Sequence, residues 1–196
     1  MRRSQAILLS VAVVALLGAA FWWLDFHAAQ SETRTNSQVT TMSSSAGTED
    51  PNWPKQRLAV YVDAEDGLGA TLAQGLKEEL GQGPNFTKVT VLDQPTDKAD
   101  SPLLVVTVAK NDGLWTPVYA RTRMEVKVEY ASLGDVRPLH QSPVGFTSGQ
   151  PSLLVDGHFE VQDNTRGIVS RQAYASMLGN YLAQQIAPSL ERAISQ

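Results

Sequence analysis

Three residues in the second half of the chain have the side-chain types of a nucleophilic hydrolase. Ser148 stands in the sequence Gly-Phe-Thr-Ser-Gly, and Asp156 and His158 follow it. The G-x-S-x-G motif of hydrolases places its serine on a sharp turn between a strand and a helix. Here the serine is displaced by one position. An exported hydrolase is therefore one alternative, and the displaced serine favours a protein without catalytic residues.

Acidic residues follow two predicted strands and offer oxygen ligands for a cation. Asp63, Glu65 and Asp66 follow the first strand, and Asp93 and Asp97 follow the second. If the two strands are parallel, these carboxylates share one sheet edge and could hold Ca²⁺. No D-x-D-x-D-G loop is present. A Ca²⁺- or ligand-sensing domain is a second alternative.

Two further patterns match known sites only in part. His158 and Glu160 share one strand face, but a zinc site needs at least three protein ligands, and His140 and His27 lie elsewhere in the chain. Gly67-Leu68-Gly69 resembles the start of a dinucleotide fingerprint, whose third glycine is replaced by Leu72. We therefore predict no metal site and no cofactor.

The clearest pattern is a strand over residues 119–130 in which charged and apolar residues alternate. A period of two places all of its charges on one face of a sheet. A loop just before it carries aromatic residues, which are enriched in protein interfaces. The predicted partner surface consists of Arg121, Arg123, Glu125, Lys127 and Trp115.

Apolar periodicity predicts the elements that carry these residues. Strands are expected at 58–62, 86–92, 103–109, 119–130 and 153–162, with a further short strand at 144–147, and helices at about 68–81 and 167–187. This order, β-α-β-β-β-(β)-α, predicts an α+β domain with a four- or five-stranded mixed sheet and two helices on one face.

Local signals predict where these elements end. Asp66 is a candidate N-cap of the first helix, and Thr165 and Ser170 are candidates for the last. Asn-Asp-Gly at 111–113 indicates a hairpin turn, and Asp-Gly at 156–157 a break in the next strand. Pro188 predicts a kink or a fresh turn in the final helix.

The N-terminal region has an uninterrupted apolar stretch from Ala6 to Leu24. Nineteen residues at about 1.5 Å each span roughly 28 Å, close to the hydrocarbon core of a bilayer. Arg2 and Arg3 precede the stretch, so the positive-inside rule places the N-terminus in the cytoplasm and the domain outside. We predict a signal-anchor over residues 1–27 that enters the bilayer through residues 6–24. A signal peptide cleaved before Phe21 is the alternative.

Residues 28–56 are polar and rich in Ser and Thr, which predicts a flexible tether between the anchor and a folded domain at 57–196. A coil of this length spans roughly 30 Å. The domain would then stand clear of the membrane surface.

The cysteine content and the net charge exclude further classes of protein and of partner. The chain of 196 residues has no cysteine, which excludes a disulfide scaffold, a thiolate metal site and a lipobox. Its formal net charge of −4 argues against nucleic acid as a partner. The element order resembles that of small α+β domains in bacterial envelope-assembly lipoproteins. We expect a membrane-anchored, extracytoplasmic binding or assembly module of a bacterial cell envelope, with an envelope protein as partner and no catalysis.

Overall fold

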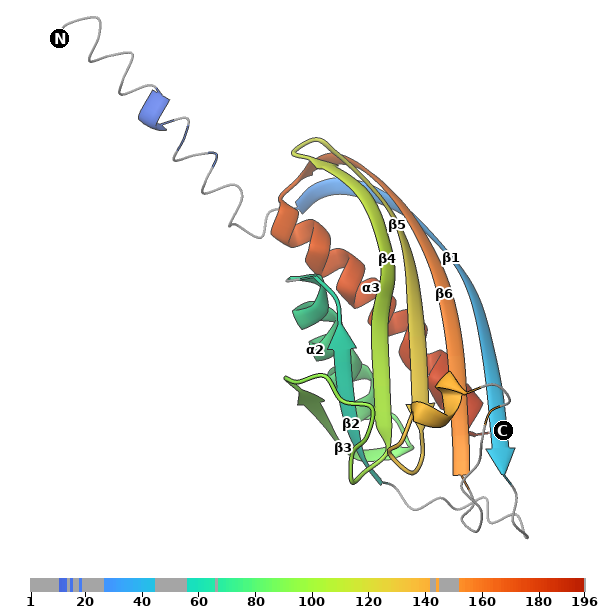
Figure 1. Cartoon of the computed structure of the whole chain (residues 1–196). Helices are drawn as coiled ribbons and strands as arrows, with labels where there is room; N and C mark the ends of the chain where they lie inside the picture. Colours follow the sequence, from blue (N-terminus) through green and yellow to red (C-terminus); the bar gives the residue numbers. More distant parts are fainter. Residues whose placement is uncertain are drawn as a thin grey trace, which may run out of the picture.

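Six strands form one mixed sheet in the order β1-β6-β5-β4-β2-β3 (Figure 1). The computed structural model describes residues 11–13, 15, 18, 27–44, 56–65, 67–141, 144 and 152–195. Its elements are β1 (His27–Ser44), β2 (Gln56–Asp63), α2 (Leu68–Gln82), β3 (Phe86–Leu92), β4 (Leu103–Thr116), β5 (Tyr119–Ala131), the short 3-10 helix η1 (Arg137–His140), β6 (Ser152–Val169) and α3 (Arg171–Ile194).

The sheet combines a parallel part and an antiparallel part. β2 pairs in parallel with β3 and β4, whereas β4, β5, β6 and β1 follow one another antiparallel. Helices α2 and α3 lie together on one face (Figure 1). The predicted α+β class is confirmed, although the sheet has six strands where four or five were expected.

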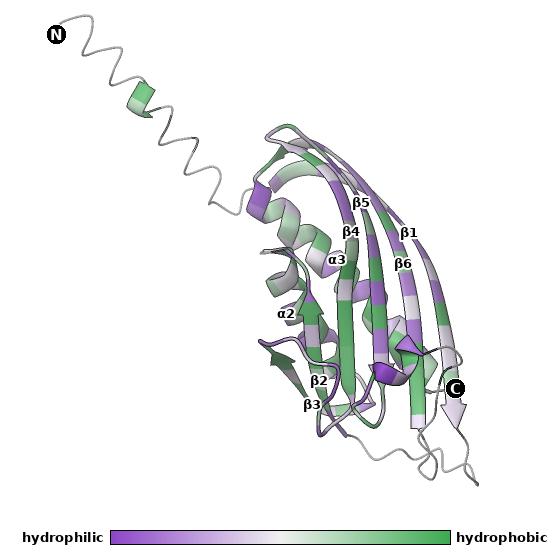
Figure 2. Ribbon diagram, viewed as in Figure 1, coloured by the Kyte–Doolittle hydropathy of each residue, from purple (hydrophilic) through white to green (hydrophobic). Residues whose placement is uncertain are grey.

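The main core lies between this sheet face and the two helices. Leu72, Leu76 and Leu80 of α2 are fully buried, as the four-residue spacing of the leucines predicts. Leu182 and Ile186 of α3 pack into the same cluster. Figure 2 shows the matching hydrophobic stretches on β2 and β4, two neighbouring inner strands of the sheet.

The two helices approach closely because small residues lie where they cross. A Cβ on Gly179 of α3 would come 2.9 Å from the backbone nitrogen of Leu72 in α2. A Cβ on Gly75 of α2 would come 2.8 Å from the Cβ of Ala183 in α3. Glycine at these two positions therefore sets the distance between the helices.

The prediction of a flexible tether over residues 28–56 is wrong for its first part. His27–Ser44 form β1, an edge strand that pairs with β6 along its whole length, from His27 opposite Val169 to Ser44 opposite Ser152. The segment has little apolar surface, which is why composition predicted a coil. Its backbone is satisfied by β6 instead, and a polar strand is tolerated at a sheet edge.

Hydroxyl side chains tie β1 to the elements beneath it. Thr33 donates a hydrogen bond of 2.8 Å to Asp163 of β6, and Thr35 donates one of 2.9 Å to the phenol oxygen of Tyr181 in α3. The threonines of this segment contributed to the prediction of a flexible tether, but threonine is β-branched and also favours a strand. The strand is therefore specified by tertiary partners more than by its own hydrophobicity.

The hairpin between β4 and β5 turns later than predicted. Residues 111–113 belong to β4, and the chain reverses at Pro117 and Val118. The Thr116 hydroxyl donates to the Tyr119 carbonyl at 2.7 Å and accepts from the Tyr119 N–H at 3.0 Å. The polar triplet continues as strand because every residue of it has a partner on β5.

The last strand and helix are longer than predicted. β6 runs without a break through Asp156 and Gly157 to Val169, and α3 begins only at Arg171. Of the two candidate caps, Ser170 caps α3, accepting from the Ala173 N–H at 3.1 Å, whereas Thr165 lies inside β6. Pro188 lies inside α3, which continues to Ile194, so no fresh helix begins there.

The remaining boundary predictions fall partly outside the described residues. α2 begins at Leu68 after Gly67, whose φ of 86° is readily adopted only by glycine. Asp66 and most of 144–147 lie outside the described residues, and so does most of the predicted membrane segment 6–24. Within the described part of the chain, no helix has the length and apolar character to cross a bilayer.

Candidate functional site

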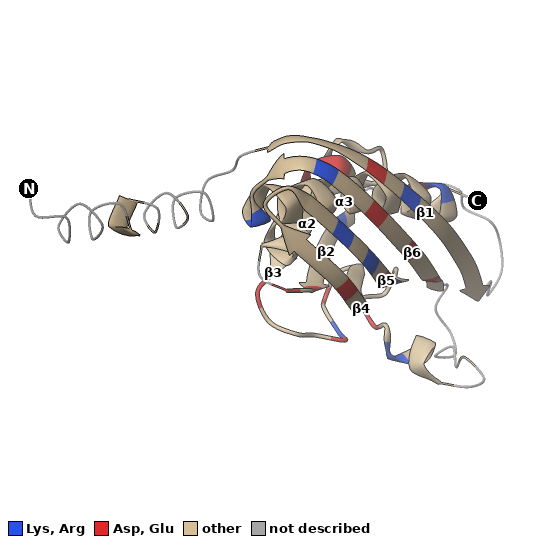
Figure 3. Cartoon of the chain, turned by 90° about the horizontal axis from the view of Figure 1, so that it is seen from above, with Lys and Arg blue, Asp and Glu red and all other residues tan. Residues whose placement is uncertain are grey.

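Neither helix covers the second face of the sheet, and its upper part is strongly charged. Figure 3 shows basic and acidic residues interspersed over the outer strands. Ala120, Met124 and Val126 of β5 are buried against the helices, so the residues between them point to the other side. We call this surface the charged face: Glu32 and Arg34 of β1, Asp112 of β4, Arg121, Arg123, Glu125 and Lys127 of β5, and His158, Glu160 and Gln162 of β6.

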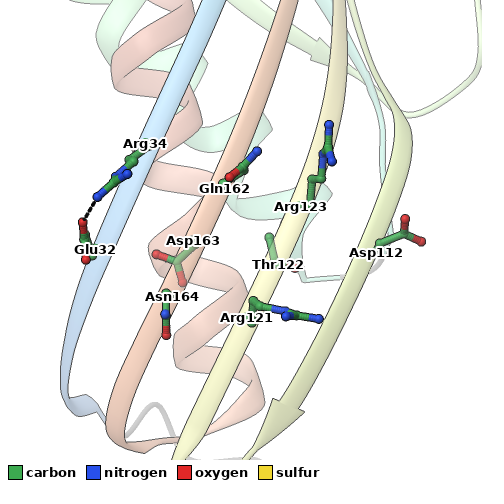
Figure 4. Close-up of a pocket in the computed structure, with 9 residues that line it drawn as sticks. All are labelled: Glu32, Arg34, Asp112, Arg121, Thr122, Arg123, Gln162, Asp163 and Asn164. Carbon is green, nitrogen blue, oxygen red and sulfur yellow. Dashed lines mark hydrogen bonds and ion pairs between the residues drawn. The ribbon is translucent and has the colours of Figure 1, made fainter.

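A shallow hollow of about 590 Å³ lies on the charged face (Figure 4). Its lining comes from four strands: Glu32, Arg34, Asp112, Arg121, Thr122, Arg123, Gln162, Asp163 and Asn164. Arg121 extends from β5 toward β4, and Glu32 and Arg34 contact each other on β1 (Figure 4). The strands therefore bring side chains that are over a hundred positions apart in sequence into one surface.

Two ion pairs on the charged face are exposed and weak. Arg34 pairs with Glu32 on the same strand, and Arg123 lies 4.0 Å from Glu160 across the β5–β6 ladder. Arg121 makes no ion pair with any residue that the structure describes. Exposed pairs of this kind contribute roughly 0–1 kcal/mol each. These charges can exchange their present partners for those of another molecule at little cost.

The structure separates Trp115 from the other residues of the predicted partner surface. β4 has a bulge between Val108 and Lys110, so the alternation of its side chains shifts by one residue. After the bulge, Asp112 and Leu114 share the face of Arg123 and Arg121, their partners on β5. Trp115 points to the opposite face and packs against the main core. A bulge cannot be read from apolar periodicity.

The lower part of the open face is covered by the segment that contains η1. A second apolar cluster lies there, in which Val136 packs with Leu103, Val105, Ala131 and Leu154. This cover buries Glu129, whose side chain is only 6% exposed. The charged face is therefore confined to the upper half of the sheet.

The carboxylate of Glu129 contacts two side chains, those of Lys127 and His140. Its Oε1 accepts from the Lys127 Nζ at 2.7 Å and lies 2.9 Å from the His140 Nε2 of η1. The alternation in residues 119–130 predicted that Glu129 shares the face of the other charged residues, and it gave no sign that His140 would cover it. The arrangement pairs a buried carboxylate and pins η1 to the sheet, but places no nucleophile beside it.

A second buried carboxylate lies on the helix side of the sheet. Asp163 is 2% exposed and accepts hydrogen bonds from Thr33 at 2.8 Å, Thr165 at 2.8 Å and Tyr174 at 2.9 Å. Burial, and next the negative charge of Asp163, raise the pKa of Tyr174. Three hydroxyl donors satisfy this carboxylate without a cation. Asp163 joins β1, β6 and α3.

A second cavity, of about 430 Å³, lies near this carboxylate on the helix side. Leu68 of α2, Leu178 of α3 and Trp115 of β4 form apolar parts of its wall. Thr122, Tyr174 and Arg171 add polar groups. Its wall therefore combines apolar and polar side chains.

Those residues proposed for hydrolysis or metal binding that the structure describes form no complete site. Ser148 lies outside the described residues, and Asp156 and His158 lie two positions apart on one face of β6. β2 and β3 are parallel, as the calcium hypothesis required. Nevertheless, no group of three or more His, Asp or Glu side chains within the described segments is placed to hold a metal ion.

Comparison with known proteins gives a distant structural similarity. No family model and no curated protein matches the chain. The chain is similar to PelC from Paraburkholderia phytofirmans, solved as a dodecamer in two crystal forms. One comparison, with a PelC variant, gives 14% identity over 77% of this chain and 96% of that chain, with a TM-score of 0.36. The other gives 14% identity over 76% and 97%, with the same TM-score of 0.36.

The chemistry that the described surface offers is electrostatic recognition. The charged face combines both signs on four adjacent strands and carries an arginine without an ion-pair partner among the described residues. Mixed charges on a rigid sheet favour a specific orientation of a bound partner over non-specific binding. Its rigidity comes from the pairing of β1, β6, β5 and β4.

Proposed function

We propose that this chain is a membrane-anchored, extracytoplasmic binding or assembly module of a cell envelope, and that it performs no catalytic step. Residues 6–24 would anchor it, with Arg2 and Arg3 on the cytoplasmic side. The charged face would bind an envelope protein. The anchor is an inference from the sequence, and the binding surface is an inference from the sheet.

One observation carries this proposal: the helices cover one sheet face and leave the charged side chains of four strands uncovered. The face holds basic residues Arg34, Arg121, Arg123 and Lys127 and acidic residues Glu32, Asp112, Glu125 and Glu160. A balanced pattern does not favour nucleic acid, which requires excess positive charge. It does favour a protein surface with the complementary pattern.

The proposal is tested by photo-crosslinking in intact cells. A photoreactive amino acid replaces Arg123 on the charged face in one variant and Glu79, an exposed residue of α2, in the matched control. We expect one discrete crosslinked product from position 123 and none of that mass from position 79. The same product from both positions, or none from position 123 in folded protein, would contradict the proposal.

Reversing the charge of one residue then tests whether the partner binds at the charged face. With the photoreactive residue at position 123, Arg121→Glu should weaken crosslinking about tenfold, because loss and reversal of an interfacial charge costs on the order of 1–2 kcal/mol. Lys77→Glu makes the same change in an exposed residue of α2 and should leave the yield unchanged. Equal effects of the two changes would show a dependence on net charge alone.

The second cavity favours one other candidate function, the sensing of a small ligand. Its volume of about 430 Å³ lies within the range of small-molecule sites, roughly 300–1,000 Å³. Ala175→Phe would fill it from the α3 side. If the cavity binds a ligand, a compound that raises the Tm of the natural chain should fail to raise that of the variant.

A further inference from the structure

We propose that one end of the sheet lies directly on the anionic lipid surface of the membrane that holds the anchor. This inference rests on the membrane anchor of the proposed function. It concerns three exposed apolar residues, Leu114, Val118 and Ile168, which we call the apolar tip. They are 52%, 62% and 46% exposed, respectively.

The apolar tip is one continuous place in the fold. Val118 lies in the β4–β5 turn, and its carbonyl accepts from the Gly167 N–H of β6 at 3.1 Å. The neighbouring Pro117 carbonyl accepts from the Val169 N–H, also at 3.1 Å. Ile168 lies between these two contacts. Single exposed apolar residues are ordinary on a protein surface. A group of them at one end of a sheet indicates a site that contacts a membrane, a ligand or another protein.

The beginning of β1 lies at this same end of the domain. His27 pairs with Val169, and Ala28 pairs with Ile168. Figure 1 shows the start of β1, the β4–β5 turn and the start of α3 together at one end of the sheet. Whatever lies near His27 therefore lies near the apolar tip.

The chain between the predicted membrane segment and β1 is very short. The apolar stretch ends at Leu24 and β1 begins at His27, so only residues 25 and 26 separate them. Three Cα–Cα steps reach at most about 11 Å. A 29-residue tether would have held the domain away from the bilayer, but the strand at 27–44 removes that freedom. The start of β1 must then lie close to the lipid headgroups.

The charges around the apolar tip select an anionic surface. Arg166 is exposed and lies opposite Tyr119, Arg121 lies opposite Leu114, and Arg171 begins α3. Two acidic residues lie in the same region: Asp112 comes two positions before Leu114 on β4, and Glu65 lines the second cavity together with Arg171. The whole chain carries −4, so an anionic membrane would repel most of the domain and attract this end. Apolar side chains flanked by arginine fit the interfacial region of such a bilayer.

Depth-dependent fluorescence quenching tests this placement in the full-length protein. The chain has no cysteine, so Val118→Cys, Leu133→Cys and Val13→Cys each give one site for an environment-sensitive dye. Leu133 is a matched control, since it is 43% exposed and follows the opposite end of β5. Val13 lies within the predicted membrane segment. Each protein is reconstituted into vesicles of phosphatidylcholine with phosphatidylglycerol, or of phosphatidylcholine alone, that contain nitroxide-labelled lipid.

We expect the probe at position 118 to be quenched strongly in phosphatidylglycerol vesicles and the probe at position 133 to stay unquenched. Arg166→Glu should lower the lipid-bound fraction at position 118 about fivefold or more, the effect of removing one basic group near an anionic leaflet. Vesicles without phosphatidylglycerol should reduce it similarly.

Three results would overturn the inference in whole or in part, and they are distinguishable. Quenching at position 13 without any excess at position 118 over position 133 would leave the anchor in place and exclude contact between the apolar tip and lipid. An unquenched probe at position 13 would remove the anchor, and with it both the membrane part of the proposed function and this inference. Strong quenching at 118 that is independent of phosphatidylglycerol would overturn the role of charge.

Discussion

The phenol of Tyr174 in α3 donates a 2.9 Å hydrogen bond to the buried carboxylate of Asp163 in β6. This contact joins the last helix to the strand that pairs with β1. Thr33 of β1 donates to the other carboxylate oxygen at 2.8 Å. The polar edge strand is therefore linked through one carboxylate to the core of the domain.

Tyr174→Phe should destabilise the protein by about 1.5–3 kcal/mol, because it removes a hydrogen bond to a buried charged group. Tyr181→Phe is the matched control: Tyr181 is half-buried, and its phenol oxygen accepts a hydrogen bond from Thr35. Its loss should cost about 1 kcal/mol or less. Urea denaturation in detergent measures both. Equal losses would mean that Asp163 does not depend on the phenol.

Glycine at the helix crossing should be intolerant of a methyl group. Gly179→Ala would place its Cβ 2.9 Å from the Leu72 nitrogen, and backbone cannot move aside as a side chain can. We expect a loss of about 1–3 kcal/mol. Gly81→Ala, in α2 with nothing within 4 Å, should instead stabilise by about 0.5–1 kcal/mol. Thermal unfolding of the two variants gives opposite shifts of Tm, and shifts of the same sign would refute the close approach.

Glu191 of α3 should make stability depend on pH. Burial, and secondly the charge of Glu79, raise the pKa of Glu191. A carboxyl with a raised folded pKa favours the folded state when protonated, so this contribution is present below the unfolded pKa and lost as pH rises through the folded pKa. Glu191→Gln should therefore raise the Tm at pH 7 and change it little at pH 4. The exposed Glu78→Gln serves as control, and a Tm gain that persists unchanged at pH 4 would contradict this origin.

The segment that contains η1 should loosen when His140 is replaced. His140→Ala removes the 2.9 Å contact with Glu129 but leaves the 2.7 Å contact of Lys127. We expect faster amide hydrogen exchange over residues 133–141, with exchange in β6 unchanged. Arg137→Ala, which removes the ion pair with Asp135, tests a contact in the same segment that does not reach the sheet. If both variants loosen the segment equally, the link to Glu129 has no special role.

Elements with a strong apolar period followed directly from the sequence. Leu72, Leu76 and Leu80 predicted α2, and the alternation after Tyr119 predicted both β5 and the face that Arg121, Arg123, Glu125 and Lys127 occupy. These patterns are local, because each side chain's direction follows from its neighbours along one element. The absence of cysteine and the −4 charge likewise required no structure.

Tertiary structure decided what no local pattern records. β1 became a strand because β6 supplies its hydrogen-bond partners, and a bulge in β4 placed Leu114 rather than Trp115 beside Arg121. Burial of Glu129 depended on a segment that returns over the sheet. In each case the deciding interaction joins residues distant in sequence, and its free energy is absent from either segment alone. The sequence thus determined the helices, the inner strands and the charged face, while long-range pairing determined where the sheet ends.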